Sequence, residues 1–334
     1  MKVSRWVRGV MSVCLMLAVC QAYAGVIDLS GGQISYIVEG GSKTLPQTSY
    51  DWWYGCSATS AGMMMGYYDR NGYAGKTYGN LVPGGVAEAE TFSFSTSGTA
   101  WSALVNNAIA SQGHVTDFYG SHFNGGGGTK DDGYGASGDD LPSSTPWHSF
   151  NCLADFMGTS QDAYGNVNGG TTFYFSSNGA KWYPADDLFW GVQDRDGMYG
   201  IGEYIHYCHY DYADDALYTQ ATDNLGLAYG FTFENYKAEI DARRPVIIHV
   251  EGHSMFGYGY DDASNTVILE NTWFLGPQTM TWGGSYYGME MVAVTVLGGL
   301  EGGAPVPEPA TILVWSGLGG IGAVIAYRRK RRAA

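Results

Sequence analysis

The sequence of 334 residues predicts an α+β fold, with helices in the first half of the domain and an antiparallel sheet in the second. A run of small and apolar residues, 57–65, follows Cys56 and is typical of a buried helix that begins near this cysteine. Further along, three β-branched or aromatic runs, 246–250, 254–260 and 266–270, are separated by short turns. Runs joined in this way predict neighbouring antiparallel strands.

The first two dozen residues have the composition of a secretory signal peptide. Three basic residues precede an apolar stretch at 10–19, and Ala-Tyr-Ala at 22–24 has the small-x-small pattern of a cleavage site. We therefore assign 1–24 as a signal peptide, with the mature chain beginning near Gly25. Export places the domain in a compartment where disulfides form.

The body of the chain is strongly acidic. Of the 17 basic residues, eight lie in the signal peptide and in the last residues of the chain, whereas all 32 acidic residues lie between them. The part from Gly25 to Pro309 therefore has nine basic and 32 acidic residues, a formal charge of −23. A surface of this charge repels nucleic acid and anionic lipid, so we expect no nucleic-acid partner.

Three cysteines remain after removal of the signal peptide: Cys56, Cys152 and Cys208. An odd number in an exported protein leaves either an intermolecular link or a free thiol. The economical hypothesis is a Cys152–Cys208 disulfide, which leaves Cys56 as the free thiol.

The elements before the sheet follow in order. Residues 25–41 alternate weakly, as in a short strand or hairpin, and 101–112 has helical spacing with Gly113 as its C-cap. From 113 to 200 the chain is rich in Gly, Ser, Asp and Asn, and we interpret it as a long Gly-rich loop insertion. A short helix near 151–157 and a strand at 171–177 interrupt it.

Two places in the chain have residue types that bind metals. Asp-Arg-Asp-Gly at 194–197 starts like a calcium loop but lacks the later ligands, so solvated loop is the better interpretation. His206, Cys208 and His209 lie at i, i+2 and i+3, which cannot all point at one metal from a regular strand. We therefore expect no metal site in either segment.

The sheet half places two candidate functional residues at one edge. An amphipathic helix at 231–244 ends at Pro245, and the three strands follow, with Gly252-His253 as the first turn and Asn271 at the end of the third strand. Antiparallel neighbours joined by short turns bring His253 and Asn271 side by side. His249 lies mid-strand in an apolar run, and we give it a structural role.

Cys56, His253, Asn271 and Gln47 form the candidate catalytic set. A thiol at a helix N-terminus faces unpaired N–H groups and the positive end of the helix dipole, which favour thiolate; the alternative is a buried structural cysteine. His253 would hold the Cys56 proton as an ion pair, and the side-chain amide of Asn271 would orient the ring. Gln47 would offer its amide N–H to the oxyanion, together with the Cys56 backbone N–H.

The order of these features resembles the papain-like fold, and looks closest to its bacterial C39-like branch, relatives of the bacteriocin-processing double-glycine peptidases. Residues 245–262 and 269–273 carry the resemblance best. It implies that the four candidate residues act as nucleophile, base, orienting residue and oxyanion donor, in the order given above. Two departures are plain: the usual Cys-Gly-Pro is Cys-Ser-Ala at 56–58, and 113–200 has no counterpart.

The end of the chain has three parts in a fixed order. Pro-Glu-Pro at 307–309 precedes an apolar run at 312–327, and a basic cluster occupies 328–332. The run is just long enough to span a bilayer, with the basic cluster on the cytoplasmic side. Residues 305–334 thus resemble the PEP-CTERM sorting signal of Gram-negative bacteria; a plain C-terminal anchor is the alternative. The resemblance implies an exosortase-type partner, anchoring in the inner membrane before sorting, and a final place at the cell surface or in the extracellular matrix.

Together these observations predict an exported cysteine peptidase that hydrolyses peptide or protein substrates through a thioester acyl-enzyme, with no metal or organic cofactor. Transfer to an amine uses the same residues, so transpeptidase activity stays open. The alternative is a non-catalytic exopolysaccharide or biofilm-matrix surface protein on a papain-like frame. Its support is composition: 50 Gly and 26 Tyr with few charges suit a binding surface of aromatic platforms.

Overall fold

The computed structural model describes residues 26–28, 35–37, 41–50, 52–79, 81, 104–118, 148–161, 164–166, 169–302 and 304–305. The predicted signal peptide and the apolar run near the C-terminus lie outside these residues. Among the residues that are described, no helix is both long and apolar enough to cross a membrane.

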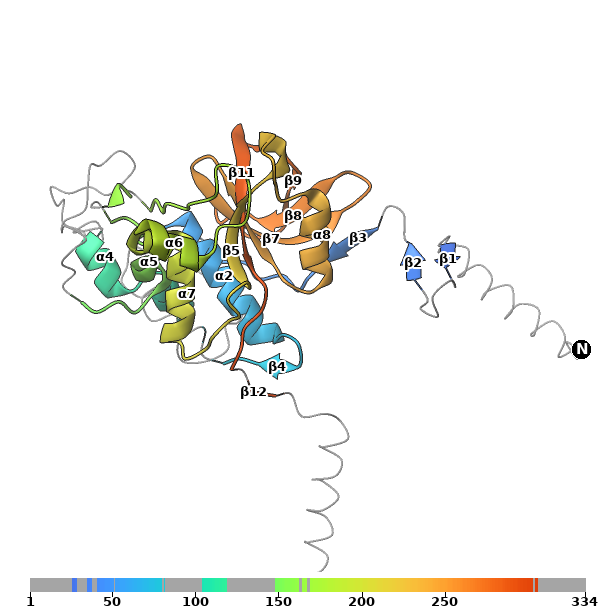
Figure 1. The fold of residues 1–334 in the computed structure, drawn as a ribbon. Coiled ribbons are helices and arrows are strands. Elements are labelled where there is room, and N and C mark those ends of the chain that lie inside the picture. The colour runs from blue at the N-terminus through green and yellow to red at the C-terminus, as the bar shows by residue number, and fades with distance from the viewer. Residues whose placement is uncertain are drawn as a thin grey trace, which may run out of the picture.

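Seven strands from the second half of the chain and β3 from the first form an eight-stranded antiparallel sheet. Its order is β10-β11-β6-β7-β8-β9; β3 also pairs with β7, and β5 with β11 (Figure 1). Two smaller pairs, β1–β2 and β12–β4, lie outside it. The strands are β1 (Val26–Asp28), β2 (Ser35–Ile37), β3 (Ser42–Thr44), β4 (Lys76–Thr77), β5 (Leu217–Ala221), β6 (Val246–Val250), β7 (His253–Asp261), β8 (Thr266–Glu270), β9 (Gln278–Thr281), β10 (Ser285–Tyr286), β11 (Met289–Leu297) and β12 (Ala304–Pro305).

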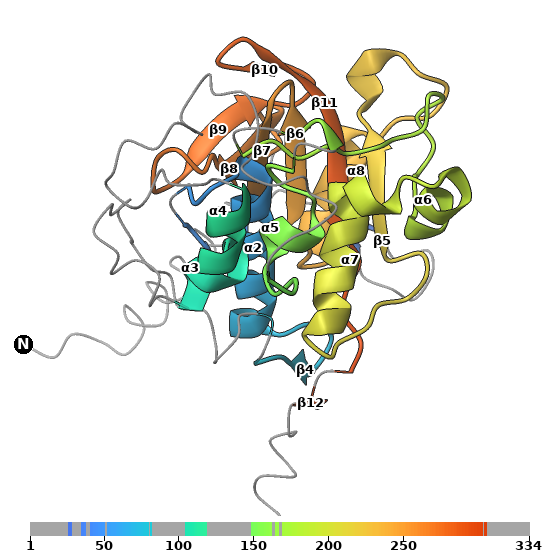
Figure 2. The ribbon, with the colours of Figure 1, turned by 90° about the vertical axis from the view of Figure 1, so that its left-hand side faces the viewer.

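The helices form a second layer beside the sheet. Helix α2 contacts β6 and β7 on one side and α3 and α5 on the other, so it lies at the junction of the two layers (Figures 1 and 2). Helix α8 packs on β3, β6 and β7, away from α5 and α7. The helices are α2 (Cys56–Asn71), α3 (Leu104–Ile109), α4 (Gln112–Phe118), α5 (Leu153–Phe156), α6 (Pro184–Trp190), α7 (Gly197–Tyr207) and α8 (Phe233–Asp241), with 3₁₀ turns η4 (Gln193–Arg195) and η5 (Asp223–Leu225).

The helix predicted from Cys56 is confirmed as α2, and it is buried along almost its whole length, from Ser57 to Asp69. Small residues make this close packing possible. A Cβ atom on Gly62 would lie only 2.6 Å from Ile109 Cγ1 of α3, and one on Gly55 only 2.8 Å from Thr159 Cγ2. Because the helix is enclosed on both sides, the position of its first residue is set by the packing of its body.

The predicted β6 and β8 are found with the predicted bounds, and α8 lies within the predicted helical segment. The second strand begins one residue earlier than predicted, because His253 already pairs with Val250 and the turn is Glu251-Gly252. Phe256 pairs with Glu270, so the first turn of the sheet and the end of β8 meet at one edge.

The described part of the predicted loop insertion 113–200 is irregular over more than half of its residues, but short helices divide it. It contains most of α4, all of α5 and α6, and the start of α7; the short helix expected near 151–157 is α5. The strand predicted at 171–177 is wrong, since this extended segment pairs with no described strand. Its Thr172 carbonyl accepts instead from Gly197 N–H (2.8 Å), and the Phe173 ring packs at a tilt of 39° against His249.

The helix predicted at 101–112 is divided in two, and Gly113 lies inside α4 instead of capping α3. The Ser111 hydroxyl accepts from the His114 N–H (3.2 Å), which caps a new helix N-terminus at this point. Periodicity alone cannot locate such a restart, because the apolar spacing continues across it.

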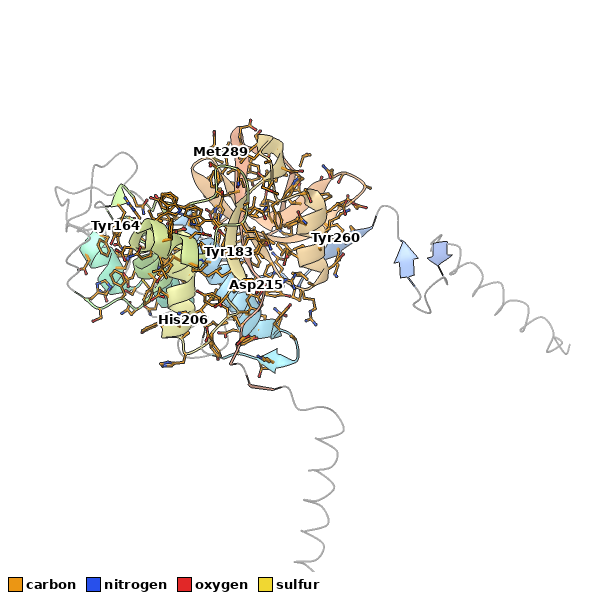
Figure 3. The ribbon with its side chains drawn as sticks, viewed as in Figure 1. Tyr164, Tyr183, His206, Asp215, Tyr260 and Met289 are labelled. Carbon is orange, nitrogen blue, oxygen red and sulfur yellow. The ribbon has the colours of Figure 1, made fainter. Side chains whose placement is uncertain are left out.

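The predicted Cys152–Cys208 disulfide is absent: all three described cysteines are thiols. Cys208 follows α7, and its sulfur donates to the Leu81 carbonyl at 3.8 Å. Cys152 precedes α5, where its sulfur faces His114 and Asp155. The segment 204–210 is mostly helix, not strand, and His206 lies near the end of α7 (Figure 3). Its Nε2 lies 3.2 Å from Asp211 Oδ1.

The close approach of α2 and α3 predicts that Gly62→Ala destabilises the protein by about 1–2 kcal/mol. Overpacking a core costs about 1–3 kcal/mol, whereas replacing a helical glycine by alanine regains at most about 1 kcal/mol. Urea unfolding of the variant measures the difference. Gly79→Ala is the control, because nothing lies within 4 Å of its added Cβ, and its stability should stay within about 0.5 kcal/mol of wild type. A Gly62→Ala variant as stable as this control would contradict the prediction.

Candidate active site

Cys56 is the first residue of α2, and the turn before it fixes its position. Trp53 N–H donates to Thr59 Oγ1 (3.0 Å), and this hydroxyl donates to the Gly55 carbonyl (2.7 Å). Tyr54 has a φ of 58°, a left-handed conformation that is costly for a residue with a side chain and clusters at functional sites. The half-buried thiol is therefore presented at the helix N-terminus by a closely bonded turn.

His253 begins β7 and is 5% exposed. Its Nε2 lies 2.8 Å from the main-chain carbonyl oxygen of Asn271, and Trp273 stacks on the ring with the centroids 4.0 Å apart. Because a carbonyl oxygen only accepts, the neutral ring carries its hydrogen on Nε2 and its lone pair on Nδ1. This tautomer leaves one ring nitrogen able to take a proton.

Cys56 and His253 line the same cavity, which has a volume of about 210 Å³. Ser254, the residue after His253, also lines this cavity, and its main-chain N–H acts to lower the pKa of the Cys56 thiol. The nucleophile and base candidates are thus brought together from the two layers of the fold. The remaining lining residues are Ser57, Gly170, Thr171, Phe173, Phe175, His249, Val250, Gly252, Val292 and Ala293.

Burial controls the charge of both groups. It raises the pKa of the Cys56 thiol above its ordinary value, against the smaller opposing effect of the Ser254 N–H. It lowers the pKa of His253 to about 4, although the bond to Asn271 acts in the opposite direction. At neutral pH the pair therefore rests as thiol and neutral imidazole. These directions favour the uncharged pair over the predicted ion pair.

Asn271 orients His253 through its main-chain carbonyl and not, as predicted, through its side-chain amide. The side chain builds the turn after β8: its Oδ1 accepts from the N–H groups of Trp273 and Phe274, both at 2.9 Å. Its Nδ2 donates to the Tyr286 hydroxyl at 2.7 Å. The side chain thus positions the carbonyl that holds the imidazole.

Gln47 does not lie among the residues that line the cavity. Its amide Nε2 donates to Glu270 Oε1 (2.8 Å), and the other carboxylate oxygen accepts from the Ser49 hydroxyl (2.7 Å) and the Gly276 N–H (3.1 Å). Glu270 thereby ties the segment before α2 to the end of β8. The structure therefore does not bring Gln47 to the place predicted for an oxyanion donor.

A second histidine, to which the sequence assigned only a structural role, lines the cavity as well. His249 Nδ1 lies 2.9 Å from Ser254 Oγ, which in turn lies 2.8 Å from Ser57 Oγ. On the other side, His249 Nε2 lies 2.8 Å from Thr295 Oγ1. These buried groups form a continuous hydrogen-bonded chain from the residue after the nucleophile into the sheet. The sequence shows a serine directly after Cys56, but only the fold shows that this serine bonds to Ser254.

Comparison of the chain with known protein families gives a match in the C-terminal segment. Residues 305–332 match the PEP-CTERM protein-sorting motif. This motif implies recognition by an exosortase-type sorting enzyme, and an exported protein that is anchored before it is sorted. Neither the curated proteins nor the solved structures contain a match to the chain.

The neutral resting pair predicts the pH dependence of Cys56 alkylation. The second-order rate constant with iodoacetamide should rise about tenfold per pH unit from pH 6 to pH 8.5, because thiolate is scarce below a raised pKa. Mass spectrometry of the modified peptide measures the rate, with Cys56→Ser as the blank. A rate that is already constant between pH 5 and 7 would establish an ion pair and contradict this prediction.

Two buried histidines also predict acid sensitivity. Burial lowers the pKa of His249 to about 3 and that of His253 to about 4, below the ordinary value of about 6.5. Between the folded and the unfolded pKa values, the histidines of the unfolded chain bind protons and those of the folded chain do not. The free energy of unfolding is therefore at its full value above pH 6.5 and falls as the pH decreases below it. The free energy of unfolding should fall by about 1.4 kcal/mol per pH unit for each histidine. Urea unfolding between pH 7 and pH 4.5 measures this free energy, which should depend less steeply on pH in His249→Gln and in His253→Gln than in wild type. The same slope against pH in wild type and both variants would contradict the prediction.

Proposed function

We propose that the protein is an exported cysteine peptidase with a papain-like arrangement, in which Cys56 is the nucleophile and His253 the base. One observation carries the proposal: a thiol at the N-terminus of a buried helix and an oriented imidazole on the adjoining sheet line one cavity. The helix comes from the first half of the chain and the histidine from the second, as the resemblance to papain-like peptidases implies.

The neutral pair defines the proposed mechanism. As the Cys56 sulfur attacks a peptide carbonyl carbon, the thiol proton passes to His253 Nδ1 and the carbonyl becomes an oxyanion. N–H groups of the first turn of α2 have no intrahelical acceptor and point toward the developing charge. The imidazolium then gives its proton to the departing amine. Water, deprotonated by the same ring, hydrolyses the thioester and restores the thiol.

Two further contacts support His253 as the base. Trp273 covers the ring face, and the Asn271 carbonyl accepts its Nε2 hydrogen, so the ring has one orientation and one nitrogen available for the thiol proton. An imidazolium strengthens its hydrogen bond to a carbonyl, which stabilises the charge that forms during attack. The low resting pKa of His253 thus belongs to the free protein, before a thiolate or oxyanion is beside it.

Activity-based labelling and peptide hydrolysis test the proposal. The full-length chain, purified in detergent, should react with an E-64-type epoxide at Cys56 alone and should cleave members of a peptide library read by mass spectrometry. Cys56→Ala should abolish both, and His253→Ala should reduce both by about 10²- to 10⁴-fold. Gln47→Ala should have a much smaller effect, because its amide is engaged with Glu270.

Asn271 offers a sharper comparison within the same assay. Asn271→Asp keeps an oxygen that accepts from the turn N–H groups, whereas Asn271→Ala removes it, so the alanine variant should lose more activity. Wild-type protein that leaves the whole library intact, and labels no faster than His253→Ala, would refute the peptidase proposal.

A non-catalytic surface or matrix protein is the second candidate, and exposed aromatic side chains favour it. Phe189 is 79% exposed, Tyr287 74% and Trp190 64%, and aromatic faces of this kind bind sugar rings. The sorting motif suits both candidates, because it determines destination and not chemistry. Retention of exopolysaccharide by Cys56→Ala protein, together with an unreactive wild-type thiol, would favour this candidate.

A further inference from the structure

A second group of reactive side chains lies in the helical layer, and none of its members lines the cavity at Cys56. One ring nitrogen of His114, the Cys152 sulfur and one carboxylate oxygen of Asp155 all lie within 4.8 Å of one another, and all three residues are buried. They come from α4, from the residue before α5 and from α5 itself. Two segments, α4 and the start of α5, thus converge at one interior point.

His148 adds a fourth donor at the edge of this group. Its Nε2 lies 3.1 Å from Asp155 Oδ2, while its Nδ1 lies 2.5 Å from Asp117 Oδ2. A carboxylate on the far ring nitrogen is the arrangement that orients histidines which bind metal ions. The second imidazole, that of His114, also turns a nitrogen to the same carboxylate, with Nδ1 2.8 Å from Asp155 Oδ1.

We propose that His114, Cys152 and Asp155 bind a zinc ion, with His148 as the fourth ligand. Sulfur and imidazole nitrogen are borderline or soft donors that favour Zn²⁺ over Ca²⁺ or Mg²⁺, and one carboxylate beside them is common at zinc sites. Ligand atoms around tetrahedral zinc stand about 3.3–3.8 Å apart, given bonds of about 2.0–2.3 Å. The ligand atoms of His114, Cys152 and Asp155, all within 4.8 Å of one another, therefore close by about 1 Å when the metal binds, and His148, which lies outside this separation, moves toward them.

The proton balance of binding is simple. The Cys152 thiol loses its proton to become a thiolate, and the ring hydrogens now directed at Asp155 leave to solvent or move to the other ring nitrogen. Asp155 keeps its two main-chain donors, Asn151 N–H and Cys152 N–H, at 2.9 and 3.3 Å, which hold the carboxylate in place. No electron is transferred, and the ion acts as a cross-link.

The site has a structural role, because its ligands join α4 to α5. Helix α5 contacts both α2 and α7, so a metal at this point stiffens the layer that supports the helix of Cys56. The proposal does not depend on peptidase activity: a zinc ion here cross-links the helical layer whether or not Cys56 is a nucleophile.

Metal titration of the full-length chain, purified in detergent with chelator and then freed of it, tests the proposal. Zinc should bind with one equivalent per chain by elemental analysis and raise the unfolding temperature. Cobalt(II) should give the intense visible bands of tetrahedral coordination and a near-ultraviolet band from thiolate-to-metal charge transfer. These spectra report the ligands directly and need no substrate.

Cysteine variants provide matched controls. Cys152→Ser should lose the charge-transfer band and the zinc-dependent rise in unfolding temperature, whereas Cys208→Ser and Cys56→Ser should keep both. His148→Gln should weaken zinc binding about tenfold or more without abolishing it. His114→Gln serves as the second test of the ligand set if Cys152→Ser does not fold. Absence of stoichiometric binding in wild type, or a charge-transfer band that survives in Cys152→Ser, would overturn the proposal.

Discussion

The hydrogen bond between Ser57 Oγ and Ser254 Oγ is the contact on which the candidate site depends. It is 2.8 Å long and buried, and it joins the helical layer to the sheet one residue away from both Cys56 and His253. The Ser254 hydroxyl is anchored in turn by His249, which is itself bonded to Thr295 on β11. A shift of α2 along the sheet would break this chain and leave buried polar groups without partners, which is costly.

The same enclosure that fixes the site also sets its charge. A helix N-terminus favours an anion by about 0.3–1 kcal/mol, which corresponds to less than one pKa unit, whereas burial shifts a pKa by several units. The raised pKa of Cys56 follows from that inequality, and burial by itself lowers the pKa of His253, which begins a strand. Position and reactivity are therefore separate requirements: packing sets the geometry of the two residues, and the proposed proton transfer from Cys56 to His253 would need a bound substrate to favour the charged pair.

The sequence was most informative where local pattern and long-range packing agree. The helix after Cys56, the strands at 246–250 and 266–270 and their antiparallel order follow from residue periodicity and short turns, and the structure has them. It was least informative in 113–200, where glycine and polar content suggested loop. The Asp196 side chain accepts from Met198 N–H (3.0 Å) and caps α7, so a polar residue in that segment begins a helix. The helical restart at Ser111 follows the same rule.

In the candidate site, too, the sequence predicts some features and not others. Cys56 and His253 were recognisable because a helix start and a strand edge can be located from sequence. The atom that orients His253 could not be predicted, because every residue has a main-chain carbonyl whatever its type. Nor could residue type reveal that the Gln47 amide is taken by Glu270, 223 positions away in the chain. Contacts of that range depend on the register of the sheet against the first segment, which no local pattern encodes.

The three described thiols show why parity was a poor guide to cysteine pairing. Counting cysteines treats them as equivalent, yet Cys56 lines a cavity, Cys208 donates to a carbonyl and Cys152 faces nitrogen and oxygen ligands. An export signal implies a compartment that permits disulfides, but a bridge also requires two sulfurs that face each other. Cys152 has imidazole and carboxylate neighbours instead, which are the partners that a metal shares with a thiolate. The described cysteines form no disulfide, although the count of cysteines predicted one. The zinc site proposed between α4 and α5 would cross-link the domain in its place.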